Sequence, residues 1–126
     1  MAQSDVRSYT MQARSTDTFG RVLCTARNHH FIVDGPVQNG CPGEAINPGE
    51  LFLAGVAACG VELVQVIAKE QQLAPSSIRV EIAGSMDRSK PVRQDLTVFN
   101  SVNLNFHIDG VTQAQATDLV ERFKRR

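Results

Sequence analysis

The segment Leu51–Ala68 constrains most strongly how this chain can fold. Its eighteen residues, LFLAGVAACGVELVQVIA, include only two strongly polar side chains. Asn47 and Pro48 stand just before it, and Asn at the N-cap with Pro at the first helical position is a pattern that begins helices. Pro75 cannot continue a helix. The segment therefore predicts one long helix, and a helix that is apolar on nearly all sides is expected to be a core helix surrounded by protein.

Eighteen apolar residues are also the length of a membrane span. We reject that alternative because Glu62 interrupts the run, small residues crowd around Cys59, and no aromatic belt flanks the segment. A chain of 126 residues is too short to bury such a helix on every side by itself. Two copies that wrap around one another would bury both helices, so we expect a homodimer and no membrane partner.

Alternating and turn-bounded segments flank the helix on both sides. The strands predicted before the helix are Val6–Ala13, Arg21–Ala26 and His30–Val33, followed by a Gly- and Pro-rich loop, Asp34–Asn47. After the helix we predict the strands Ser77–Ser85 and Leu96–Ile108 and a final helix that opens at Thr112, with Ala114, Leu119, Val120 and Phe123 as candidates for its apolar face. Strands and helices do not alternate one for one, so the fold class is α+β with antiparallel sheets, in a single domain over residues 1–126.

Charge and cysteine content exclude several classes of function. Thirteen Lys and Arg balance thirteen Asp and Glu. The sequence therefore lacks the basic surface of a nucleic-acid-binding protein. Three cysteines, an odd number, do not make a disulfide framework, and a reduced cytoplasmic setting is the expectation.

Cys59 is the candidate reactive residue. It lies in the middle of the predicted helix among small residues, just after an irregular loop. A buried free cysteine is often only a small hydrophobic side chain, and this alternative stays open. A thiolate at mid-helix gains nothing from the helix N-terminus, so a reactive Cys59 would need a cation from another segment.

The stretch Asn47–Cys59, NPGELFLAGVAAC, resembles the signature of the OsmC/Ohr family of osmotically inducible and organic-hydroperoxide-resistance proteins. The resemblance implies an intertwined homodimer, with antiparallel sheets, a long buried central helix and a C-terminal helix. It also implies a role in oxidative or osmotic stress defence. Cys59 would attack an organic hydroperoxide, and a dithiol reductant would restore it without cofactor or metal.

The same resemblance implies an Arg from the N-terminal strands and a Glu at the helix start, which would hold the thiolate and orient the substrate. Arg21 takes the place of that Arg, with Arg14 as the rival. Gly49 occupies the position of the family's Glu, so the nearest carboxylate is Glu50, one residue later. A resolving Cys, which the pattern has in the C-terminal helix, has no counterpart in the final helix predicted here. We therefore expect the broad OsmC-like group rather than the peroxidase subgroup proper.

The other cysteines and the histidines give weaker signals. Cys41, in the Gly- and Pro-rich loop, is an alternative resolving thiol for Cys59, whereas Cys24 is expected in the core. Adjacent strand histidines point to opposite faces, so His29 and His30 are not expected to share a metal ion. The alternative function is a non-catalytic dimeric protein that binds a small hydrophobic ligand in a cleft around Cys59.

Overall fold

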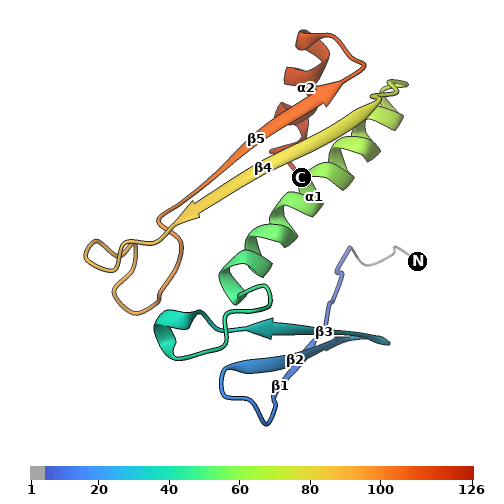
Figure 1. Ribbon diagram of the computed structural model, residues 1–126. Coiled ribbons are helices and arrows are strands. Elements are labelled where there is room, and N and C mark those ends of the chain that lie inside the picture. Colours follow the sequence, from blue (N-terminus) through green and yellow to red (C-terminus); the bar gives the residue numbers. More distant parts are fainter. Residues whose placement is uncertain (1–4) are drawn as a thin grey trace. The chain divides into compact units, whose positions relative to one another are not determined.

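Three antiparallel strands form the first sheet of the computed structural model, which describes residues 5–126 (Figure 1). They are β1 (Gln12–Ser15), β2 (Arg21–Ala26) and β3 (His29–Asp34), in the order β1-β2-β3. Strand β2 has the bounds that its sequence predicts, and the register places Arg21 opposite Asp34. This register brings a cation and a carboxylate together at one end of the sheet.

The prediction for the first strand is wrong in its bounds. Val6–Ala13 shows a loose alternation, but β1 begins only at Gln12. Gln12 pairs with Thr25, and β2 ends one residue later at Ala26. The β1–β2 ladder therefore starts where β2 can provide a partner, because a ladder extends only as far as both of its strands do.

The loop after β3 is folded back onto the ends of the strands. It contains a single 3₁₀ turn, η1 (Val37–Asn39). The Asp34 N–H donates to the Ile46 carbonyl at 3.0 Å, and the Gly35 N–H donates to the Gly20 carbonyl at 2.8 Å. The loop is therefore ordered by backbone hydrogen bonds although it is rich in Gly and Pro.

The long helix α1 (Pro48–Glu70) begins where the sequence predicts and extends two residues beyond Ala68. It ends in a Schellman motif, because the Gln72 N–H donates to the Lys69 carbonyl at 3.1 Å and the Leu73 N–H to the Ala68 carbonyl at 2.8 Å. This turn requires Gln72 to adopt a positive φ of 59°. The left-handed region favours glycine over residues that carry a Cβ.

Replacing Gln72 with glycine is therefore expected to stabilise the protein by about 0.5–1 kcal/mol. Urea unfolding at fixed protein concentration measures the change. Gln71→Gly is the matched control, because the Gln71 N–H continues the helical pattern to the Ile67 carbonyl. Glycine there is expected to destabilise by about 0.5–1 kcal/mol. Equal effects of the two substitutions would contradict the assignment of strain to Gln72.

A two-stranded antiparallel hairpin, β4 (Ser77–Ser85) and β5 (Ser101–Asp109), supports the second half of α1. Along both strands of the hairpin, half-buried residues alternate with exposed ones, as predicted for Ser77–Ser85. The half-buried residues share one face. The core is formed by Val64, Ile67 and Ala68 of α1 with Leu119 of α2 (Gln113–Phe123). The partly buried side chains packed against it are Leu73, Ile78, Phe106, Ile108 and Phe123. Gly60 lets the rings of Phe106 and Phe123 approach the helix, since a Cβ there would lie 3.2 Å from Phe106.

Strand β5 starts five residues later than the prediction of Leu96–Ile108. Ser101 pairs with Ser85, the last residue of β4, so residues 96–100 lie beyond the paired register, although the Asn100 N–H still donates to the Ser85 carbonyl at 2.8 Å. They belong instead to a 15-residue loop over residues 86–100, which we call the β4–β5 loop. Phe99 anchors this loop by stacking on Phe52, with ring centroids 5.4 Å apart.

Helix α2 begins with a capping box, as the Thr112 start predicts. The Gln115 N–H donates to the Thr112 hydroxyl at 3.1 Å, and the Thr112 N–H donates to the Gln115 side chain at 2.9 Å. Leu119 is fully buried, and Val120 and Phe123 are half-buried. The prediction is wrong for Ala114, which is exposed. Ala116, which is half-buried, lies on the apolar face in its place.

Within one chain, α1 is not surrounded by protein as its sequence predicts. Its buried residues are Gly60, Val64, Ile67 and Ala68, which share one face. The opposite face is exposed, with Phe52 at 55% and Val66 at 37% exposure. By length and composition alone, α1 is the one helix in residues 5–126 that could cross a membrane, a test that the core helix of a soluble protein also passes.

The chain divides into two compact units. The first ends at Leu51, and the second begins at Phe52. The first contains the three-stranded sheet, the loop after it and the first turn of α1. The second contains the rest of α1, the hairpin and α2. The α+β class with antiparallel sheets is confirmed, while the single domain over residues 1–126 stays a prediction.

Candidate functional site

Cys59 lies on the exposed face of α1. Residues at helical spacing share this face, and they are Phe52, Gly55, Cys59, Glu62 and Val66. The thiol is free and exposed, and it has no hydrogen-bond partner among residues 5–126. A thiol with small neighbours and open access can meet a substrate, which the buried-core alternative for Cys59 does not allow within one chain.

Glu50 caps the start of α1. Its carboxylate accepts the Asn47 N–H at 3.0 Å, and the Asn47 side chain accepts the Glu50 N–H at 2.8 Å. This reciprocal pair is a capping box, and the negative charge also suits the positive end of the helix dipole. The carboxylate predicted to orient a substrate is thus already engaged by the backbone of its own helix.

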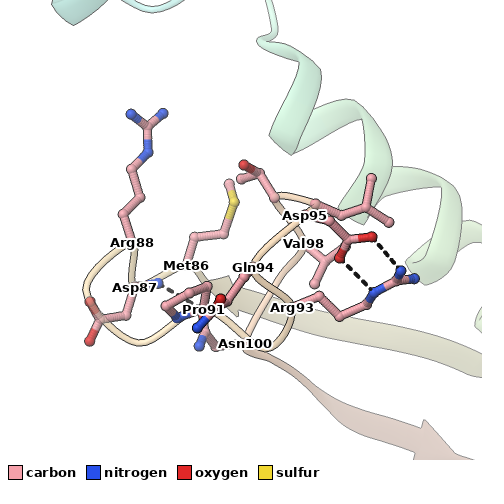
Figure 2. A pocket seen from close by; sticks show the side chains of 11 residues that line it. Met86, Asp87, Arg88, Pro91, Arg93, Gln94, Asp95, Val98 and Asn100 are labelled. Carbon is pink, nitrogen blue, oxygen red and sulfur yellow. Dashed lines mark hydrogen bonds and ion pairs between the residues drawn. The ribbon is translucent and has the colours of Figure 1, made fainter.

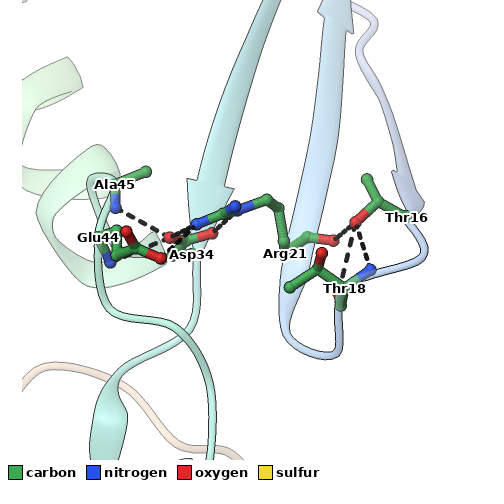
Figure 3. Close-up of polar contacts among 6 residues, drawn as sticks. All are labelled: Thr16, Thr18, Arg21, Asp34, Glu44 and Ala45. Carbon is green, nitrogen blue, oxygen red and sulfur yellow. Dashed lines mark hydrogen bonds and ion pairs between the residues drawn. The ribbon is translucent and has the colours of Figure 1, made fainter.

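Arg21 is held by two carboxylates in the first unit (Figure 3). Its Nε and Nη2 donate to the two oxygens of Asp34 at 2.8 and 2.9 Å, a bidentate pair. Nη2 also donates to Glu44 at 3.2 Å. The hydrogen bond from Arg21 holds the pKa of Asp34 well below its ordinary value, and the same bond raises the pKa of Arg21. Both groups are therefore charged throughout the physiological range.

Asp34 and Glu44 are the partners that sequence reasoning missed. Asp34 ends a strand just before Gly35 and Pro36, where a polar residue is typical of a turn and gives no sign of burial. Only the β2–β3 register reveals its role, because it sets Arg21 opposite Asp34. Glu44 lies ten residues further along an irregular loop, and no periodicity marks it.

The predicted site residues fall in different units. Arg21 and Glu50 lie in the first unit, where no hydrogen bond or ion pair among the described residues joins them, and Cys59 lies in the second. Arg14, the rival cation, is exposed on β1 opposite Leu23. The roles of Cys59, Arg21 and Glu50 together remain predictions.

The other two cysteines are packed by the first unit. Cys24 is buried in β2, in keeping with its expected core position. The Cys41 side chain lies against Gly20 and Gly35, and a Cβ on Gly35 would contact its sulfur and lie 2.9 Å from its Cβ. Cys41 is therefore closely packed between these two glycines. Its pairing with Cys59 stays a prediction.

The β4–β5 loop lines an open pocket of about 390 Å³ (Figure 2). Its lining includes the apolar side chains of Met86, Leu96 and Val98 together with an ion pair in which Arg93 Nη2 lies 2.6 Å from Asp95 Oδ2. Hydrogen bonds from Ser89 lower the pKa of Asp87. The sequence predicts a polar connection over Asp87–Gln94 and gives no sign of this hollow.

The histidines form no metal centre in the part of the chain that the structure describes. No three His, Cys, Asp or Glu residues gather there in a way that could hold an ion. His30 Nδ1 lies 2.9 Å from the Thr25 hydroxyl, and His107 Nε2 lies 3.5 Å from Glu81. That the protein works without metal or cofactor remains an expectation.

The structure combines two antiparallel sheets with a long helix that carries an exposed cysteine, Cys59. The model of the family described as OsmC-like protein matches residues 41–126, so the chain belongs to the OsmC-like family. No curated protein matches the sequence.

Solved structures share the fold over nearly the whole chain. An OsmC-like protein from Mycoplasma pneumoniae has a TM-score of 0.81 at 15% identity, with 95% of this chain and 82% of that chain covered. An organic hydroperoxide resistance protein from Elizabethkingia anophelis has a TM-score of 0.77 at 21% identity, covering 98% and 85%. An organic hydroperoxide resistance protein OsmC from Legionella pneumophila, described as a predicted redox protein, has a TM-score of 0.71 at 25% identity, covering 97% and 85%.

Proposed function

We propose that this protein reduces organic hydroperoxides through the Cys59 thiolate. The observation that carries the proposal is the free, exposed Cys59 on α1, within the matched segment of the OsmC-like family. Two structures of the same fold are named organic hydroperoxide resistance proteins, which supports this choice among thiol reactions. The expected substrate is a small hydrophobic peroxide, and the expected location is the cytoplasm.

The reaction proceeds in two steps that need no cofactor. The Cys59 thiolate attacks the terminal peroxide oxygen, the O–O bond breaks, and the leaving alkoxide takes a proton to become an alcohol. The sulfur is oxidised to a sulfenic acid. A dithiol reductant then attacks that sulfur, water leaves, and closure of the reductant's own disulfide returns Cys59 to the thiol.

In this proposal Arg21 stabilises the thiolate and orients the peroxide. A positive charge is needed because Glu62 shares the exposed face with Cys59, three residues away on the helix, and a carboxylate there disfavours a second negative charge. Glu50 would contribute through the helix start that it caps. Arg14 is the alternative cation.

A second copy of the chain is proposed to cover the exposed face of α1. The face carries Phe52, Val66 and small residues around Cys59, and an apolar helix face of this size is rarely left in water. Two copies would then bury both helices, as the intertwined dimer requires. Light scattering at micromolar concentration is expected to give twice the mass of one chain, and the mass of a single chain would contradict it.

The alternative function is binding of a small hydrophobic ligand without chemistry, which the same apolar face favours. Peroxide consumption separates the two functions. We expect the protein to consume cumene hydroperoxide in the presence of dithiothreitol faster than a protein-free mixture does. Equal rates, combined with saturable binding of cumyl alcohol, would instead establish the binding protein.

A further inference from the structure

An open groove of about 500 Å³ lies between strand β5 and helix α2, within the second unit. Five consecutive β5 residues, 104–108, line it. Successive side chains of a strand point to opposite faces, so neither face of β5 can present five residues in a row. The groove therefore runs along the backbone edge of β5, with α2 beside it (Figure 1).

This edge of β5 has no strand beside it in residues 5–126. β5 pairs only with β4, in a two-stranded sheet. A strand directs the N–H and C=O groups of alternate residues to its two sides, so those that point away from β4 face the groove. Among the described residues, no backbone hydrogen bond joins residues 102–108 to a segment other than β4. An open edge of this kind is a template for pairing with another extended chain.

The other side chains of the groove combine an apolar wall with carboxylates. Ala116 and Val120, one helical turn apart on α2, are half-buried and lie near Phe106 of β5. Glu121 of α2 and Glu81 of β4 also line the groove, and their side chains are 50% and 59% exposed. No Lys or Arg stands among the lining residues. The groove is therefore suited to a ligand that has both apolar and cationic side chains.

Charge argues against a second copy of β5 as the occupant of this groove. β5 contains no Lys or Arg and ends at Asp109, so a copy of it would bring no lysine or arginine to Glu81 or Glu121. These two carboxylates pair with Arg79 and Lys124, and all four side chains are about half exposed or more. Exposed pairs of this kind are weak, so a ligand can replace them. A strand that carries its own Lys or Arg complements the groove better.

We propose that the groove between β5 and α2 binds an extended segment of another protein, which adds to the sheet as a strand beside β5. Backbone hydrogen bonds to the open edge provide affinity. Apolar side chains at alternate positions of the segment pack against Ala116 and Val120, and Lys or Arg at the positions between them face the carboxylates. This inference is independent of the peroxide chemistry, because it uses neither Cys59 nor Arg21.

The test uses the full chain and a fluorescein-labelled peptide of sequence Lys-Val-Thr-Val-Lys-Val-Thr, with fluorescence anisotropy as the measure of binding. Saturable binding is expected, and the same peptide with glutamate in place of lysine should bind about tenfold more weakly. Amide hydrogen exchange followed by nuclear magnetic resonance locates the bound peptide. At saturation, exchange at alternate residues of 104–108 should slow by about tenfold or more, because their N–H groups become hydrogen-bonded.

Glu121→Lys is expected to weaken binding of the lysine peptide by about tenfold. Asp118→Lys is the matched control, since it makes the same change of charge on α2 outside the lining of the groove, and it should stay within about twofold. The inference is overturned by absent binding, by equal binding of the two peptides or equal losses in the two variants, or by binding without slower exchange at residues 104–108. Slow exchange there that rises with protein concentration, without peptide, would place a second copy in the groove and overturn it too.

Discussion

Replacing Cys59 with serine is expected to reduce the rate of cumene hydroperoxide consumption to that of the protein-free control. A serine hydroxyl is not ionised at neutral pH, so the substitution removes the nucleophile while it preserves the size of the side chain. The loss should be about a thousandfold or more, as for other enzymes that lose a nucleophile. Because serine differs from cysteine only in its oxygen atom and Cys59 lies outside the core of the chain, the variant should fold like the natural protein.

Cys41→Ser is the matched control for this substitution. Cys41 is packed against Gly20 and Gly35, and with a dithiol present in excess its loss is expected to leave the rate within about twofold. A Cys59→Ser protein that consumes peroxide as fast as the natural one would end the enzyme hypothesis. A large loss in Cys41→Ser alone would move the chemistry to the first unit.

Replacing Leu119 with alanine is expected to destabilise the protein by about 2–5 kcal/mol. Leu119 is 0% exposed and joins α2 to Val64, Ile67 and Ala68 of α1. Its truncation removes apolar contacts and leaves a cavity that the two helices and the hairpin can fill only in part. Urea unfolding followed by far-ultraviolet circular dichroism measures the loss, at one fixed protein concentration because a dimer's stability depends on it.

Leu119→Met is the control for this second prediction, since it conserves most of the volume and should cost less than about 1.5 kcal/mol. Thr117→Ala, on the exposed side of the same helix, should lie within about 0.5 kcal/mol of the natural protein. If Leu119→Ala cost no more than Thr117→Ala, Leu119 would not be the centre of the core.

Local sequence signals predict the bounds of an element correctly when the neighbouring segments pair or pack with it along its whole length. The alternation in Ser77–Ser85 gives β4 at its observed bounds, and Asn47 with Pro48 marks the start of α1. The starts of β1 and β5 could not be predicted in the same way, because each strand begins where its neighbour provides a partner. Pairing is a property of two segments, and periodicity reports on only one.

The candidate site was predictable only in part. Cys59 follows from the family resemblance, but its exposure follows from the face of α1 that the second unit leaves open. Arg21 was predicted as a cation without its partners. Asp34 becomes one of them through strand register, and Glu44 and Ala45 through the fold of an irregular loop. Glu50 is a helix cap in the structure because it stands three residues after Asn47.

The central claim, that Cys59 is the thiol that peroxide oxidises, is tested most directly by trapping its sulfenic acid. The protein is treated with one equivalent of cumene hydroperoxide in the presence of dimedone and mapped by peptide mass spectrometry. The account predicts a dimedone adduct on the peptide that contains Cys59, and none on those that contain Cys24 or Cys41. Adducts confined to Cys24 or Cys41, or peroxide consumption with an unmodified Cys59, would contradict it.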